Sequence, residues 1–153
     1  MKVKELMSAD VKSCTEETDL ATVAKMMWDG DCGIIPVIDG ERHVTGVITD
    51  RDICIAAATR SLEPARIRVR EAMTSDVSTC SPDADARSAL QALKERRVRR
   101  VPIVDRQNRL VGMLSLNDLV TRADFHQGTA VPGDELLNTL RAISAHTTTV
   151  AGA

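Results

Sequence analysis

Apolar and polar positions follow a regular order through the first half of the chain. Residues 11–15 are predicted as a short strand, and residues 19–28 carry apolar side chains at helical spacing. Residues 34–38 and 44–48 are apolar, rich in β-branched side chains and separated by a polar turn, which predicts two paired strands. A second helix is predicted over residues 50–59. The pattern therefore predicts a β-α-β-β-α unit.

The second half repeats this order at a constant offset of 66 residues, so that Gly112 corresponds to Gly46 without a gap (112 − 46 = 66). Each copy is marginal in length for an independent domain, so we expect the two copies to share a core. The second copy is predicted as a strand, a helix, two strands and a helix, at residues 77–80, 82–97, 98–104, 110–114 and 117–125.

Each copy leaves its last strand through the same motif, GVITDRD in the first and GMLSLND in the second. Thr49 and Asp52, like Ser115 and Asp118, have the spacing of a capping box. Such a helix start also presents amide groups and a positive dipole end to an anion, and a carboxylate can accept both hydroxyls of a ribose. The alternative interpretation is two helix caps that stabilise the fold and bind nothing.

A proline interrupts the first strand of each predicted pair, at Pro36 and Pro102. Because proline lacks an amide hydrogen, it favours an edge or a break in strand pairing. We expect the flanking backbone groups to be free for the edge of a flat heterocycle, and the alternative is a protected edge strand. The residues concerned are Ile35, Val37, Val101 and Ile103.

The composition narrows the possible functions. Aromatic residues make up 1% of the chain and the net charge is −2, so a nucleic-acid partner is not expected. No apolar run reaches the roughly 20 residues of a membrane span, and the N-terminus lacks an apolar signal segment. Four cysteines and three histidines show no metal-binding spacing, so reduced thiols and a cytoplasmic location are expected. No nucleophile–base pair stands out, and neither an enzyme nor a cofactor is expected.

Tandem copies with an apolar-Pro-apolar strand followed by Gly-apolar-x-Ser/Thr-x-x-Asp resemble the cystathionine-β-synthase (CBS) domain pair, or Bateman module. The resemblance covers about residues 1–124. It implies an α+β fold in which two repeats pack around a pseudo-twofold axis and leave two clefts. It also implies adenosyl ligands, namely AMP, ADP, ATP or S-adenosylmethionine, and pairing into homodimers.

The resemblance further implies where the ligand makes contact. Asp52 and Asp118 would hold ribose, and the hydroxyls three residues before them would lie near phosphate. The backbone around the two prolines would frame adenine, with Thr15 or Ser81 nearby.

Arginines distinguish the two copies. Arg99 and Arg100 stand at a strand entrance in the second copy, where the first has glycine and isoleucine, and guanidinium groups suit phosphate. Arg51, inside the first motif, is a further candidate. If only one cleft takes a phosphorylated ligand, we expect it to be the cleft with Asp118.

We expect a first repeat at residues 1–61, a linker at 62–68 and a second repeat at 69–125, followed by residues 126–153 with an amphipathic helix over 134–144 and a flexible tail. The functional hypothesis is a non-enzymatic regulatory module that senses adenosyl ligands and signals to an unknown protein in trans. The alternative, from a different class, is a structural or assembly module with unoccupied clefts.

Overall fold

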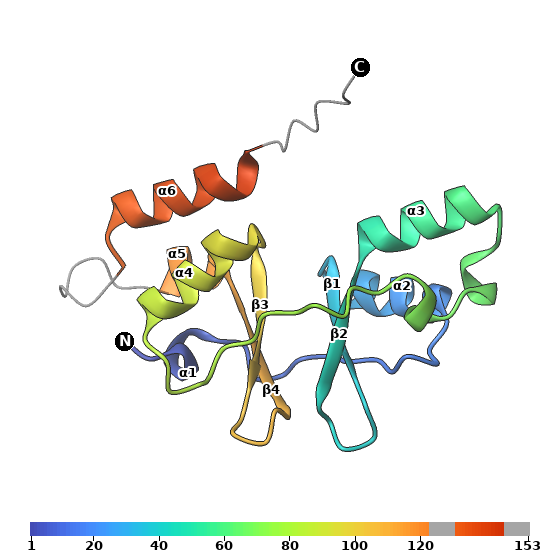
Figure 1. Ribbon diagram of the computed structural model, residues 1–153, viewed down its shortest axis with the longest axis horizontal. Helices are drawn as coiled ribbons and strands as arrows, with labels where there is room; N and C mark the ends of the chain where they lie inside the picture. The colour runs from blue at the N-terminus through green and yellow to red at the C-terminus, as the bar shows by residue number, and fades with distance from the viewer. Residues whose placement is uncertain (123–130, 146–153) are drawn as a thin grey trace.

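The computed structural model describes residues 1–122 and 131–145 (Figure 1). Two β-hairpins lie side by side, with helices beside each of them, which confirms the predicted tandem α+β fold. The elements are, in chain order, α1 (Val3–Leu6), α2 (Leu20–Asp29), β1 (Ile34–Ile38), β2 (Val44–Thr49), α3 (Asp50–Arg60), the 3₁₀ turns η1 (Pro64–Arg66) and η2 (Val69–Glu71), α4 (Ala86–Arg96), β3 (Arg100–Val104), β4 (Leu110–Ser115), α5 (Leu116–Arg122) and α6 (Gly133–Ser144).

The two hairpins match each other in detail at the 66-residue offset. The register shifts once in each hairpin, after Val37 in β1 and after Ile103 in β3. The turns contain Arg42 and Asn108, whose backbones are left-handed with φ of 70° and 61°. The repeat found in the sequence therefore extends to local irregularities of the backbone.

Two predicted strands are absent, and one predicted helix start was wrong. Residues 11–15 and 77–80 form no strand, because each contacts its hairpin through a single bridge, at Cys14 and Cys80. The helix predicted from residue 82 begins only after Asp85, whose Oδ1 accepts a hydrogen bond from the Arg87 amide at 3.0 Å. Asp85 is thus the N-cap, in the position that Asp19 takes before α2.

The segment leading into each repeat packs on the other repeat. Val3 and Leu6 of α1 lie in the core of the second repeat, whereas Ile67 and Val69 lie in the core of the first. Backbone pairs join Ser8 to Met113 and Thr74 to Val47, each through two hydrogen bonds of 2.9 Å. Each hairpin therefore gains its outer partner from the other half of the chain.

This exchange explains the glycine of the repeated motif. A Cβ atom added at Gly46 would lie 2.8 Å from the carbonyl oxygen of Thr74, and one at Gly112 would lie 3.0 Å from that of Ser8. The contact at Gly46 is shorter than real Cβ atoms show, and the contact at Gly112 is tighter than nine in ten of them. Only glycine lets the crossing segment lie against the last strand.

Helix α6 lies outside the repeat and packs against α4 (Figure 1). Leu136 is 8% exposed and joins the core of the second repeat, and Thr139 donates from Oγ1 to the Glu135 carbonyl at 2.9 Å. This confirms the predicted helix over residues 134–144. The predicted tail at 147–153 and the end of the preceding helix at Phe125 lie outside the described residues. No helix in the described ranges has both the length and the apolar character that crossing a membrane would require.

Candidate ligand-binding cleft

Both strand-to-helix corners form the predicted capping boxes. At the first corner, Thr49 Oγ1 accepts from the Asp52 amide at 3.1 Å, and Asp52 Oδ2 accepts from the Thr49 amide at 2.9 Å. At the second, Asp118 Oδ2 accepts from the Ser115 amide at 2.9 Å and from its hydroxyl at 2.6 Å. The Ser115 hydroxyl accepts in turn from the Asp118 amide at 3.0 Å. These bonds fix the carboxylate at each corner.

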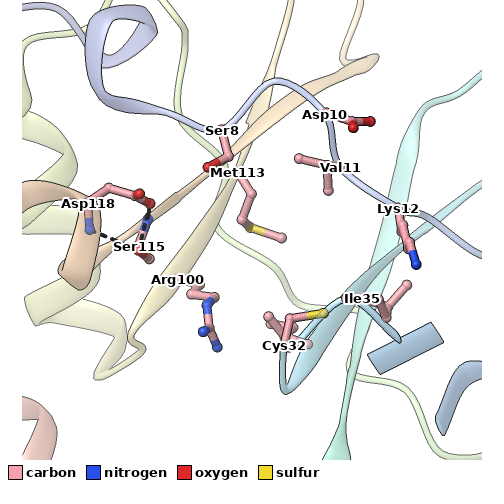
Figure 2. A pocket seen from close by; sticks show the side chains of 12 residues that line it. Ser8, Asp10, Val11, Lys12, Cys32, Ile35, Arg100, Met113, Ser115 and Asp118 are labelled. Carbon is pink, nitrogen blue, oxygen red and sulfur yellow. Dashed lines mark hydrogen bonds between the residues drawn. The ribbon is translucent and has the colours of Figure 1, made fainter. Parts of the chain in front are cut away.

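A cavity of about 440 Å³ opens beside the second corner (Figure 2). Its volume is in the range of small-molecule sites in proteins. Because the leading segments cross over, the cavity lies between the repeats and takes residues from both. The lining residues are Ser8, Asp10, Val11, Lys12, Gly30, Cys32, Ile34, Ile35, Arg100, Met113, Ser115 and Asp118.

Two cationic side chains and two carboxylates, those of Asp10 and Asp118, line this cavity. Arg100 and Lys12 have no side-chain hydrogen bond or ion pair with another residue that the structure describes. Figure 2 shows Arg100 between the corner at Ser115 and the side chain of Cys32. The aliphatic part of the lining comes mainly from the first repeat and its leading segment. The cavity therefore combines an apolar wall with two donors that suit an anionic group.

Several residues predicted from the sequence lie around this cavity, and they come from different elements. Arg100 is at the start of β3, Ser115 ends β4, and Asp118 is in α5, whereas Ile35 belongs to β1 of the other repeat. Arg99 lines an adjoining cavity of about 440 Å³, which Arg100 and Ser115 also line. The fold thus brings these predicted residues together at one corner.

The expectation of free backbone groups beside the prolines was wrong. On the outer edge of β3, the carbonyl of Pro102 accepts from the Cys80 amide at 3.0 Å. Because successive residues of a strand point to opposite edges, the residues on either side of each proline direct their backbone groups into the hairpin. Cys14 makes the same bond to Pro36 in the first repeat, also at 3.0 Å. The residues paired in this way are Ile35, Val37, Val101 and Ile103.

Other predicted residues do not line the cavity. Thr15 and Ser81 are exposed and make local contacts, with the Thr18 hydroxyl at 3.3 Å and the Asp83 amide at 3.3 Å. Thr49, Arg51 and Asp52 belong to the other corner and are not among the residues around the cavity at Asp118.

Sequence reasoning missed part of the lining. Ser8, Val11 and Lys12 come from the leading segment of the first repeat, and Met113 lies opposite Ser8 in β4. The alignment of the two leading segments shows that they are equivalent, but it does not show which hairpin each segment contacts. The cavity lies between the two repeats, as the resemblance implied for the clefts, but no signal identified the leading segment of the first repeat as part of its lining.

Burial makes two of the four cysteine thiols less acidic. All four are free thiols, and burial raises the pKa of Cys14 to about 11 and also raises that of Cys80. A raised pKa keeps these two thiols protonated near neutral pH, and thiols in that form are weak nucleophiles. Within residues 1–122 and 131–145, no three histidine, cysteine, aspartate or glutamate side chains are grouped to hold a metal ion.

Comparison with known proteins identifies relatives with the same repeat. Inosine-5'-monophosphate dehydrogenase of Methanocaldococcus jannaschii is 30% identical over 126 residues, which are 82% of this chain but 24% of that enzyme. The uncharacterized protein YlbB of Bacillus subtilis is 30% identical over 119 residues, 77% of this chain and 79% of YlbB. The chain thus spans about a quarter of the enzyme and most of the shorter protein.

Solved structures share the fold. Hypoxic Response Protein I with two coordinated zinc ions superposes with a TM-score of 0.74 at 27% identity, covering 81% of this chain and all of that chain (100%). The CBS domain pair of protein MJ0100, in complex with 5'-methylthioadenosine and S-adenosyl-L-methionine, gives 0.70 at 22% identity, with 78% and 97% coverage. CBSX2 in complex with AMP gives 0.68 at 20% identity, with 79% and 94% coverage.

The CBS domain profile matches this chain twice, at residues 3–58 and 69–124. These two matches include the hairpins, both corners and all the residues that line the cavity at Asp118. The chain therefore belongs to the CBS domain family, as a tandem pair of CBS domains.

Proposed function

We propose that this chain is a non-enzymatic regulatory module that binds an adenosyl ligand beside Asp118 and signals to a partner protein in trans. AMP, ADP, ATP and S-adenosylmethionine are the candidates. The observation that carries the proposal is the cavity of about 440 Å³ between the repeats, in which a fixed carboxylate, a hydroxyl and two cations meet an aliphatic wall.

Each part of an adenosyl ligand has a matching group in this cavity. The Asp118 carboxylate is the proposed acceptor for the ribose hydroxyls, a role that acidic residues have in dinucleotide-binding folds. Arg100 and Lys12 suit the phosphate of a nucleotide or the carboxylate of S-adenosylmethionine. Val11, Ile34 and their aliphatic neighbours offer an apolar surface to the purine.

The solved relatives support this ligand class. Two of them, the pair from MJ0100 and CBSX2, are complexes with adenosyl ligands. Their identities of 22% and 20% establish the shared fold, and the ligand class of this chain rests on the chemistry of its own cavity.

The position of the cavity suggests how binding would be communicated. Its walls come from both repeats, so a ligand that fits one relative arrangement better shifts the population toward that arrangement. A partner that distinguishes the two arrangements then responds to the ligand concentration.

Exposed apolar side chains support a homodimer as part of the same proposal. Among the described residues, five large apolar side chains on helices are exposed to solvent, and they belong to four different helices. The side chains are those of Trp28, Ile55, Val120, Leu137 and Leu140. Val120 and Leu140 line one cavity together, and exposed apolar side chains that gather in this way are typical of an interaction site.

Calorimetric titration with AMP, ATP, S-adenosylmethionine and 5'-methylthioadenosine tests the proposal. We expect at least one of these ligands to bind. Arg100→Gln should lower the affinity for the phosphate-bearing ligands roughly tenfold or more, because a hydrogen bond to a charged group is lost. 5'-Methylthioadenosine has no phosphate, so the substitution should change its affinity little. Arg106→Gln, in the exposed β3–β4 turn, is the matched control. Absence of binding by all four ligands would contradict the proposal and favour a structural module with unoccupied clefts.

A further inference from the structure

The 66-residue offset allows the two corners to be compared position by position. Asp10 and Gly30 are among the residues that line the cavity at Asp118. The offset places Asp76 and Arg96 at the same positions relative to Asp52 (10 + 66 = 76; 30 + 66 = 96). At these two positions the aspartate is kept, whereas the glycine at one cleft is replaced by an arginine at the other.

The arginine is paired with this aspartate. Its Nη1 lies 2.9 Å from Oδ2 of Asp76, so the pair joins the end of α4 to the leading segment of the second repeat. That segment lies against β2, because Thr74 pairs with Val47, two residues before Thr49. The ion pair thus joins the two positions whose counterparts, Asp10 and Gly30, line the cavity at Asp118.

At the Asp118 cleft no such bridge forms, because Gly30 has no side chain to reach Asp10. The side chains of Arg96 and Asp76 are 48% and 82% exposed, as expected for groups on an outer rim. Exposed ion pairs are individually weak, so any effect on ligand access comes from the bulk of the arginine side chain at this position.

We infer that the Arg96–Asp76 pair closes the cleft at Asp52 to adenosyl ligands, so that the chain binds one ligand, beside Asp118. The inference rests on the proposed function and adds to it the number of sites and the group that sets that number. Thr49 and Asp52 then serve as a helix cap in the wild-type chain, and they become a ligand site when the pair is removed.

Calorimetric stoichiometry with AMP and, separately, S-adenosylmethionine provides the test. We expect one site per chain for the wild type and two for Arg96→Ala. Asp76→Ala is also expected to give two sites per chain, because it removes the partner that holds the Arg96 side chain in place. Lys94→Ala removes the same charge from the same helix and is expected to leave one site.

The possible failures are distinguishable. If the wild type binds neither ligand, the proposed function is wrong and this inference falls with it. If the wild type binds one ligand and both Arg96→Ala and Asp76→Ala also bind one, the proposed function stands and the inference is wrong. Two sites in the wild type would also overturn it. Circular dichroism of each variant establishes that the fold is intact.

Discussion

At Gly46 and Gly112, the absence of a side chain connects the sequence motif to the packing of the two halves. The carbonyl oxygens of Thr74 and Ser8 come so close that a Cβ atom would lie within 3.0 Å of each. The glycine therefore serves the crossing of the leading segment, while the hydroxyl and carboxylate that follow it cap the helix. One short motif thus carries two separate structural tasks.

Gly46→Ala is predicted to destabilise the fold by about 1–3 kcal/mol, because an added methyl group must displace backbone in a well-packed region. Gly40→Ala is the matched control, since nothing lies within 4 Å of its added Cβ atom, and its effect should remain within about 0.5 kcal/mol. Urea unfolding monitored by circular dichroism measures both. Equal stability of the two variants would show that the segment at Thr74 moves away freely.

The residue scale also shows where sequence reasoning succeeds and where it fails. The capping boxes were predictable, because every atom involved lies within four residues of sequence. The groups beside Pro36 and Pro102 were not, because a proline shows that an amide hydrogen is missing but not which edge of the strand lacks it. The edge is set by the single bridges at Cys14 and Cys80.

Among the elements, α6 illustrates the limit of a local pattern. Apolar residues at helical spacing predicted the helix over residues 134–144, and the structure has it at Gly133–Ser144. The same pattern did not indicate which element α6 packs against. Packing on α4 buries Leu136 and leaves Leu137 48% exposed.

Leu136→Ala is predicted to lower the free energy of unfolding by about 2–5 kcal/mol, because it leaves a cavity in the core of the second repeat. Leu137→Ala, one residue further along the same helix, should cost less than about 1 kcal/mol, since its side chain is half exposed. Urea midpoints of the two variants provide the measurement. Similar midpoints would indicate that α6 does not pack on α4 in solution.

The leading segments set a second limit at this scale. The constant offset establishes which residues are equivalent, but it is compatible with each segment packing on its own hairpin or on the other one. The structure has the second arrangement, with Ser8 against Met113 and Thr74 against Val47. Lys12 and Val11 were missed as cavity residues for this reason.

For the whole molecule, the outer surfaces of the helices carry information on assembly. Trp28 is the only tryptophan of the chain and is 87% exposed on α2. An indole in this position is costly to leave in water and is typical of an interface between subunits. Its fluorescence therefore reports directly on the proposed homodimer.

We predict that the emission of Trp28 shifts to shorter wavelength as the protein concentration rises, in parallel with a doubling of mass in sedimentation equilibrium. Trp28→Asp should remain a monomer over the same range, because a buried charge disfavours the interface. Gln107→Asp, in the exposed β3–β4 turn, should behave as the wild type does. A mass and an emission maximum that do not change with concentration would contradict the dimer.

The central claim is that the carboxylate at one corner binds a ligand in addition to capping a helix, and Asp118→Ala and Asp52→Ala separate the two roles. Each variant loses one cap, so both should lose about 0.5–2 kcal/mol of stability. Calorimetry with the tightest of the four ligands should show affinity reduced roughly tenfold or more for Asp118→Ala and within about twofold of wild type for Asp52→Ala. Wild-type affinity in Asp118→Ala, or an equal loss in both variants, would contradict the account.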